Sequence, residues 1–331
     1  MTYPSTILKS KGIQLQMKKM LLIINPKSGI KKSTQIFENV KDIMSENEWE
    51  LETVYTEYRG HATELATAAV GYDRIVCMGG DGTFNEVANG IMLNPVGFEL
   101  GYIPAGSTND FAHGLGLSKK ITKNAKFAAN QSAFPTDMGL FCANGEKTRH
   151  FSYVASFGLF TDISYSTDQK IKNIFGHLAY VFEGIRSIAD LNRFRHFKMR
   201  IEFGGEAFES EFIFGAVTNS TSLGGLVKLD RKKVHVGDGK FEILLIRKPH
   251  TLAELTETLT ELVNNRFRTG NIIFGHVDNI RLISQEPLKW TFDGEYAGEV
   301  RIADISVLHG ALNLVRPTTV RRKPFFKKKA L

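Results

Sequence analysis

Residues 74–83 read Arg-Ile-Val-Cys-Met-Gly-Gly-Asp-Gly-Thr, an apolar strand pattern that runs directly into a glycine-rich turn. A helical pattern follows, with one apolar face formed by Phe84, Val87, Ala88, Ile91 and Met92. Glycines let the backbone approach a phosphate closely, and the N–H groups at a helix N-terminus attract anions. The stretch therefore predicts a strand–turn–helix unit with an anion site at Gly79-Gly80-Asp81-Gly82-Thr83. The alternative is a tight turn in which Asp81 only caps the helix.

The same alternation of strand and helix extends on both sides of this unit. Strand patterns at 20–24, 49–56 and 101–104 alternate with helical patterns at 34–46 and 61–70. This order predicts a mostly parallel sheet with helices on both faces. After about residue 135 strand patterns dominate, and they predict an antiparallel β-sandwich interrupted by helices near 178–192 and 252–263. These later strands are expected at 149–156, 198–203, 211–217, 240–246, 279–283, 288–291 and 300–308.

Two further loops follow predicted parallel strands, and loops at the carboxyl ends of such strands meet at the ligand crevice. The first is Asn25-Pro26-Lys27-Ser28-Gly29, in which Lys27 and the backbone after it are suited to hold phosphates. It lacks the spacing of a P-loop. The second, residues 104–112, offers Thr108 and Asn109 as hydrogen-bonding groups and Asp110 as a carboxylate. A plain turn and a capped helix are the alternatives for these two loops.

Charge and composition limit the partners of the chain. It has 331 residues and a net charge of +7, and the last 16 residues from Arg316 hold seven basic groups and no acid. Without them basic and acidic residues balance, which argues against a broad nucleic-acid-binding face. The tail suits an anionic membrane surface, with a solvated terminus as the alternative. No apolar run approaches the roughly 18 residues of a spanning helix. We expect a cytoplasmic protein, peripherally associated with the membrane.

The three loops, taken with a late acidic motif, resemble the diacylglycerol kinase catalytic family, which includes bacterial diacylglycerol kinases, YegS-like lipid kinases, and sphingosine and ceramide kinases. The resemblance covers residues 21–314. The elements that carry it are Asn-Pro-x-Ser-Gly at 25–29, Thr56 with Gly-His-Ala at 60–62, Gly-Gly-Asp-Gly-Thr-x-Asn-Glu at 79–86, Pro-x-Gly-Ser-x-Asn-Asp-Phe-Ala at 104–112, Asp-Met-Gly at 137–139 and Asp-Gly-Glu at 293–295.

The resemblance implies an α/β nucleotide-binding domain, related to those of NAD kinases and phosphofructokinases, and a β-sandwich domain that binds the lipid. We expect an extension at 1–17, the first domain at 18–135, and the second at 136–309, with 310–331 returning to the first. The implied nucleotide-site residues are Asn25, Pro26, Lys27, Ser28, Gly29, Thr56, Gly79, Gly80, Asp81, Gly82, Thr83, Asn85 and Thr108. Asp81 would lie close to the ATP phosphates and Mg²⁺, and it is counted among the candidate catalytic residues.

The resemblance also assigns chemistry to the late motif, which by itself is a plain hairpin turn. An acidic residue at this position accepts the proton of the substrate hydroxyl, and both Asp293 and Glu295 are candidates. A structural Mg²⁺ is implied for the stretch 230–238, which is more basic here than the usual pattern. Asp230 is its candidate ligand, and a solvated loop is the alternative.

The predicted reaction is transfer of the ATP γ-phosphate to a lipid hydroxyl, with diacylglycerol as the first substrate to test. Two other functions stay open: a kinase of a soluble substrate, as in NAD kinases, and a non-catalytic nucleotide- or lipid-binding protein. An Asn-Asn-Glu element typical of NAD kinases is absent from the sequence. A homodimer is a further possibility. The aromatic stretch 157–182 suits either a hydrophobic core or an acyl-chain pocket, and we favour core.

Overall fold

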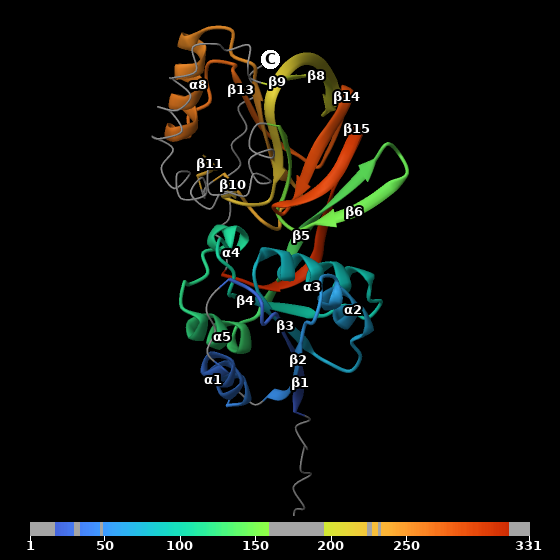
Figure 1. Ribbon diagram of the computed structural model, residues 1–331, viewed down its shortest axis with the longest axis vertical. Helices are drawn as coiled ribbons and strands as arrows, with labels where there is room; N and C mark the ends of the chain where they lie inside the picture. Colours follow the sequence, from blue (N-terminus) through green and yellow to red (C-terminus); the bar gives the residue numbers. More distant parts are fainter. Residues whose placement is uncertain are drawn as a thin grey trace, which may run out of the picture.

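The computed structural model describes residues 17–29, 34–46, 49–158, 195–223, 227–230 and 233–317. Its two halves are stacked along the long axis, with the α/β half below and the strand-rich half above in Figure 1. A single hydrogen-bonded sheet runs through both, in the order β13-β12-β9-β7-β14-β15-β4-β3-β1-β2. The predicted combination of an α/β domain and a mostly antiparallel β-sandwich is confirmed.

The first half contains a parallel sheet with helices on both faces. Its strands are β1 (Lys18–Ile24), β2 (Trp49–Tyr55), β3 (Arg74–Gly79) and β4 (Glu99–Pro104). Its helices are α1 (Thr34–Ser45), α2 (His61–Ala68), α3 (Asp81–Leu93), α4 (Asp110–Leu115) and α5 (Ile121–Asn130). The register pairs β1 with β2 and β3, and β3 with β4, all in parallel.

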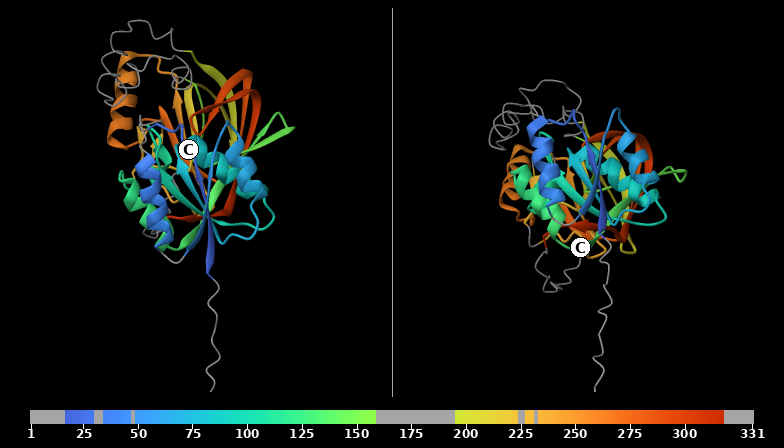
Figure 2. Two further views of the ribbon diagram at one scale, coloured as in Figure 1. Left: turned by 60° about the horizontal axis from the view of Figure 1, so that its bottom comes forward. Right: turned by 90° about the horizontal axis from the view of Figure 1, so that it is seen from below.

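Alternation along β1 explains why both faces of this sheet are covered. Leu21 and Ile23 face the core that includes α2 and α3, whereas Leu22 and Ile24 face the core that includes α1 and α5. Successive side chains of a strand point to opposite faces, so an entirely apolar strand must be buried on both. Figure 2 shows the two groups of helices on opposite sides of the sheet.

The second half is built on long antiparallel strands. Its elements are β5 (Ala133–Ala143), β6 (Lys147–Phe151), β7 (Val154–Gly158), β8 (Phe197–Phe203), β9 (Glu206–Thr218), β10 (Ser222–Leu223), β11 (Val227–Lys228), β12 (Phe241–Arg247), α8 (Leu252–Asn264), β13 (Ile272–Val277), β14 (Asn279–Phe292) and β15 (Glu295–Val315). Both β7 and β8 lie between β9 and β14, pairing with different segments of them. Aromatic side chains such as Phe157, Phe212 and Trp290 fill the interior.

Strand β15 connects the halves. It pairs with β14 and β5, and its residues Asn313 and Leu314 then pair in parallel with β4. The predicted boundaries at residues 135 and 309 fall inside β5 and β15, so neither half is a separate sheet. The register between β5 and β15 shifts between Leu308 and Leu312.

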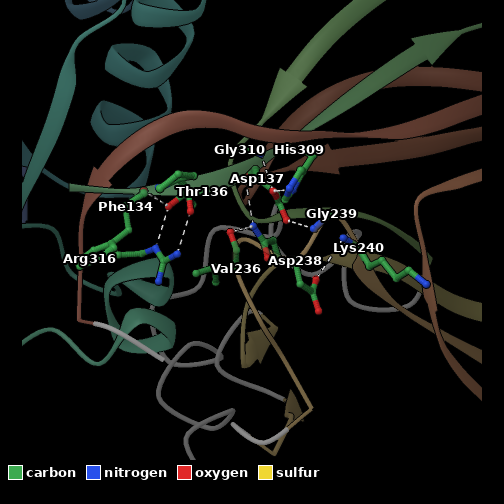
Figure 3. A network of polar contacts seen from close by, with 12 residues as sticks. Phe134, Thr136, Asp137, Val236, Asp238, Gly239, Lys240, His309, Gly310 and Arg316 are labelled. Carbon is green, nitrogen blue, oxygen red and sulfur yellow. Dashed lines mark hydrogen bonds and ion pairs between the residues drawn. The ribbon is translucent and has the colours of Figure 1, made fainter. Parts of the chain in front are cut away.

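The buried carboxylate of Asp137 on β5 holds this irregular segment. It accepts hydrogen bonds from the backbone N–H groups of Gly310 and Gly239, each at 2.7 Å, and contacts His309 Nδ1 at 2.9 Å. Figure 3 shows these groups converging from β5, from β15 and from the turn before β12. A carboxylate has enough acceptor positions to satisfy all three. Asp137 therefore joins β5, β15 and the turn before β12 at the point where β15 leaves its regular pairing with β5.

Arg316 corrects one expectation about the basic tail. Its side chain is buried, and its guanidinium donates to Thr136 Oγ1 and to the Pro135 carbonyl, each at 2.9 Å. These acceptors satisfy the N–H donors of the buried guanidinium, so Arg316 belongs to the fold and not to a free tail. Residues 318–331, the extension up to residue 16, the predicted helix at 178–192 and most of the aromatic stretch lie outside the described residues. Phe157, the first residue of that stretch, is in the core.

Several predicted elements differ from those observed. The strand expected at 149–156 is two strands, β6 and β7, whereas those expected at 279–283 and 288–291 are one strand, β14. Residues 152–153 interrupt the first because their backbone N–H groups turn toward the Asp293 carboxylate. Strands β5 and β13 and helix α5 were not predicted. The pattern of β5 is obscured by Pro135, which is tolerated because the pairing of β5 with β6 begins only at Gly139 and does not reach Pro135.

Candidate active site

The three predicted loops converge at the carboxyl ends of β1, β3 and β4. A side-chain carbon at Gly106 would lie 2.6 Å from Gly80 Cα, and one at Gly29 would lie 2.6 Å from Ser107 N. Contacts shorter than 3 Å are forbidden to carbon atoms, so glycine is required where these backbones touch. The loops therefore form one surface of backbone groups, which the sequence predicted from their positions after parallel strands.

Asn25 fixes the first loop against the glycine turn. Its backbone N–H donates to the Met78 carbonyl at 2.9 Å, and its side-chain amide donates to Thr83 Oγ1 at 2.8 Å. Its side-chain oxygen accepts from Lys27 N, which shapes the loop as an Asx turn. The Lys27 ammonium donates to the Glu57 carbonyl at 3.1 Å and lies beside the opening. An exposed cation is thus available at the rim, next to the N-terminus of α3.

An open cleft of about 410 Å³ lies over these loops. Its lining residues are Asn25, Lys27, Ser28, Gly29, Thr56, Glu57, Tyr58, Arg59, Gly80, Gly82, Thr83, Glu86, Gly106 and Glu295. Eight of the predicted nucleotide-site residues are among them. The other predicted residues, Pro26, Gly79, Asp81, Asn85 and Thr108, do not line it. The cleft receives groups from both halves of the chain, because Glu295 belongs to β15.

Asp81 lies beneath the turn, and its carboxylate organises the neighbouring loop. It accepts the backbone N–H groups of Asp110 at 2.8 Å and Phe111 at 3.3 Å, which begin α4. Burial raises the pKa of the Asp81 carboxyl to about 6, although the Asp110 N–H partly offsets this by stabilising the charged form. Asp81 thus ties the loop at 104–112 to the glycine turn.

The structure separates the two carboxylates of the late motif. Asp293 is 5% exposed, and its oxygens accept the backbone N–H groups of Ser152, Tyr153 and Val154 at 2.7, 2.9 and 3.0 Å. The side-chain amide of Asn85 on α3 donates to the same carboxylate. Burial raises the pKa of Asp293 even though these four donors oppose the shift. A carboxylate so enclosed is suited to holding the β14–β15 turn against α3.

Glu295 has the opposite surroundings. Its side chain is 52% exposed, and Oε2 pairs with the guanidinium of Arg59 from the loop after β2. Its other oxygen lies over the glycine turn, since a carbon added at Gly82 would be 3.0 Å from Glu295 Oε1. The Asp293 backbone has a φ of +50°, and Gly294 follows at +86°. This turn points one carboxylate into the protein and the other into the cleft.

Five lining residues were not predicted: Glu57, Tyr58, Arg59, Glu86 and Gly106. Glu86 accepts the Gly60 N–H at 2.9 Å and so places the loop after β2 beside α3. The Tyr58 ring stacks on His61, with ring centroids 4.7 Å apart. Gly106 and Glu86 belong to the motifs at 104–112 and 79–86, so the sequence could have predicted them as lining residues. The loop at 57–59 has no comparable pattern.

The residues around Asp81 fit a magnesium ion shared with phosphates. Mg²⁺ prefers oxygen ligands and usually binds proteins through one or two carboxylates together with substrate phosphates. Each Asp81 oxygen keeps acceptor capacity beyond the backbone bonds described above. Within the described ranges, no group of three His, Cys, Asp or Glu side chains could form a complete metal cage. Asp230 is exposed on its loop, and its role as a metal ligand stays a prediction.

Comparisons with known proteins match both halves. A model of the diacylglycerol kinase catalytic domain matches residues 19–141, and a model of the YegS C-terminal NAD kinase beta sandwich-like domain matches residues 154–316. The diacylglycerol kinase of Bacillus subtilis strain 168 is 32% identical over 286 residues, covering 85% of this chain and 91% of that protein. The diacylglycerol kinase of Staphylococcus carnosus strain TM300 is 28% identical over 286 residues, covering 86% and 90%. A solved diacylglycerol kinase of Bacillus anthracis strain Sterne has the same fold, with a TM-score of 0.70 at 22% identity over 92% of this chain and 98% of that chain.

Proposed function

Because the chain belongs to the diacylglycerol kinase family and is an ATP-dependent lipid kinase, we propose that it phosphorylates diacylglycerol to phosphatidic acid. One observation carries the proposal beyond the family assignment. The Glu295 carboxylate of the second half lies over Gly82, at the N-terminus of α3 in the first half. A phosphate at that helix end and a hydroxyl beside Glu295 would therefore meet in one cleft.

In this proposal the ATP phosphates bind the glycine loops. The N–H groups at the start of α3 face the γ-phosphate, and Lys27 adds a positive charge at the rim. The lipid hydroxyl oxygen forms a bond to the γ-phosphorus while the bond to the β,γ-bridging oxygen breaks, and ADP leaves. Glu295 accepts the hydroxyl proton. Phosphoryl transfer depends mainly on such positioning and on electrostatic stabilisation.

Asp293 and Asp81 act as positioning residues in this scheme. Asp293 accepts a hydrogen bond from Asn85 on α3 and so holds the turn that carries Glu295 close to that helix. Asp81 orders the loop at 104–112 and, with the phosphates, would hold Mg²⁺, which neutralises phosphate charge when bound. The remaining predicted nucleotide-site residues, including Thr108, keep their proposed role although they do not line the cleft.

We further propose that the enzyme works at a membrane surface. Among the described residues, no helix is long and apolar enough to cross a bilayer. Diacylglycerol resides in the membrane, so its hydroxyl must be presented to the cleft from there. The basic residues beyond Arg316 are suited to this contact on the cytoplasmic side. Homodimerisation also stays a prediction.

A radiolabel transfer experiment tests the reaction. The full chain is incubated with γ-labelled MgATP and mixed micelles that contain diacylglycerol, monoacylglycerol, ceramide or sphingosine, with NAD as a soluble acceptor. We expect labelled phosphatidic acid, and we expect Glu295→Gln to reduce its formation by about 10²–10⁴-fold. Preferential labelling of NAD would support a soluble-substrate kinase. Nucleotide binding without any labelled product would support a non-catalytic protein.

A further inference from the structure

One ion pair crosses the cleft between the two halves. Arg59 Nη2 contacts Glu295 Oε2, although the residues are 236 positions apart in the chain. The two side chains are 77% and 52% exposed, so neither is held by burial. An exposed pair of long side chains contributes little to stability. Its position, over the glycine turn, matters more than its strength.

The backbone around Arg59 is held by hydrogen bonds, whereas its side chain is 77% exposed and has its ion pair with Glu295. The next residue, Gly60, has a φ of +92° and donates its N–H to Glu86 on α3. The Glu57 N–H before it donates to His61 Nδ1 at 3.2 Å, and the Glu57 carbonyl accepts from Lys27. These bonds place the start of the Arg59 side chain at the cleft. The guanidinium can therefore move without disturbing the loop.

Two anionic groups compete for this guanidinium once ATP is bound. The first is Glu295, whose other oxygen lies over Gly82. The second is the γ-phosphate, which the proposed function places at the same turn. Guanidinium groups bind phosphates through paired hydrogen bonds, and such charge-assisted bonds are stronger than neutral ones. A γ-phosphate carries more charge than one carboxylate, so it is the stronger competitor.

We propose that Arg59 is a positioning residue that exchanges partners during the reaction. Without nucleotide it pairs with Glu295 and occupies the carboxylate that must accept the hydroxyl proton. When ATP binds, Arg59 turns to the γ-phosphate, and Glu295 becomes accessible to the lipid hydroxyl. The inference rests on the proposed function and adds an order of events to it: ATP binds first, and its binding frees Glu295 to accept the hydroxyl proton. ADP, which lacks the γ-phosphate, leaves the Arg59–Glu295 pair intact.

Direct binding of MgATP and MgADP to the full chain, measured by titration calorimetry, tests this exchange. Arg59→Met should weaken ATP binding about tenfold or more, as expected for a charge-assisted contact to phosphate, and change ADP binding less than about twofold. Glu295→Gln should tighten ATP binding about twofold to fivefold, because it releases Arg59 from an exposed ion pair. The double variant should lose that gain. Arg59→Lys should restore part of the ATP affinity.

Arg281→Met is the matched control. Arg281 on β14 pairs with Asp304 on β15 at 3.4 Å, and these side chains are 48% and 35% exposed, so the pair is solvent-accessible and lies within one half of the molecule. It should bind both nucleotides as wild type does. Thermal unfolding of each variant establishes that it is folded.

Two results would overturn the inference. Equal weakening of ATP and ADP by Arg59→Met would show that Arg59 only joins the halves. A gain from Glu295→Gln that persists in the double variant would show simple repulsion between carboxylate and phosphate. Failure of the proposed function looks different: wild-type protein would form no labelled lipid, whatever the binding pattern. If wild-type protein forms labelled phosphatidic acid but either of the two results above is obtained, the partner exchange of Arg59 is rejected and the proposed kinase function stands.

Discussion

Substitution of the two carboxylates in the β14–β15 turn should separate stability from activity. Asp293→Asn should destabilise the fold, because its carboxylate accepts four hydrogen bonds inside the protein. Glu295→Gln should leave stability nearly unchanged, because that side chain is 52% exposed and makes one ion pair. The kinase activity should fall most in Glu295→Gln, which should be folded but nearly inactive.

The magnitude follows from how the bonds are distributed. Oδ1 of Asp293 accepts the N–H groups of Tyr153 and Val154, and Oδ2 accepts those of Ser152 and the Asn85 amide. An asparagine replaces one oxygen with an NH₂ group, so at least two donors lose their acceptor in either orientation. Each buried unsatisfied donor costs about 1–3 kcal/mol. We expect a loss of about 2–6 kcal/mol for Asp293→Asn, against less than about 1 kcal/mol for Glu295→Gln.

Urea unfolding of both variants and of wild type at one pH measures the first quantity, and thermal melts check it independently. The expected fall in Tm for Asp293→Asn is roughly 3–9 °C for a chain of this length. The radiolabel assay at saturating lipid measures the kinase activity of both variants, at a temperature well below the melting range of the less stable one. Wild-type unfolding free energy for Asp293→Asn would refute the assignment of this residue as a buried tether. Substantial turnover by Glu295→Gln would refute its assignment as the proton acceptor.

Three other perturbations test separate parts of the structure. Burial raises the pKa of Asp81 from 3.8 to about 6. Between these two pH values the folded state holds a proton that the unfolded chain has lost, so the contribution of Asp81 to the free energy of unfolding falls as pH rises. Asp81→Asn should therefore gain roughly 2–3 kcal/mol relative to wild type between pH 4 and pH 7, and a pH-independent difference in urea unfolding would contradict this. Gly106→Ala should raise KM for ATP about tenfold or more, because a methyl carbon there would lie 2.6 Å from Gly80 Cα. Gly275→Ala is the control: its methyl carbon would have its nearest contact at 3.6 Å, so it should show the wild-type KM in the same assay. Deletion of residues 318–331 should weaken sedimentation with anionic vesicles at low salt more than at high salt, and equal binding by the truncated chain at low salt would eliminate the tail as a membrane contact.

The first half of the fold was predictable because its signals are local. Three strands of the α/β half are short apolar runs, whereas β2 alternates apolar and polar residues, and a glycine-containing loop or a helical pattern follows each strand, as around Gly80. The convergence of three loops followed from the rule that parallel strands end on one edge. Strand β5 was not predictable in this way. It is defined by pairing with β15, a partner more than 150 residues away, and Pro135 weakens its own pattern.

The sequence by itself determined the strand–turn–helix units, the convergence of the glycine loops on the surface that we propose for phosphate, and the family to which the chain belongs. These properties depend on neighbouring residues, whose spacing sets backbone geometry directly. Tertiary structure alone decided that Asp293 points inward and Glu295 outward, since burial is a property of the whole fold and both residues are carboxylates in one turn. It also decided that Arg59 meets Glu295, because β15 crosses between the halves and carries the acidic turn to the cleft.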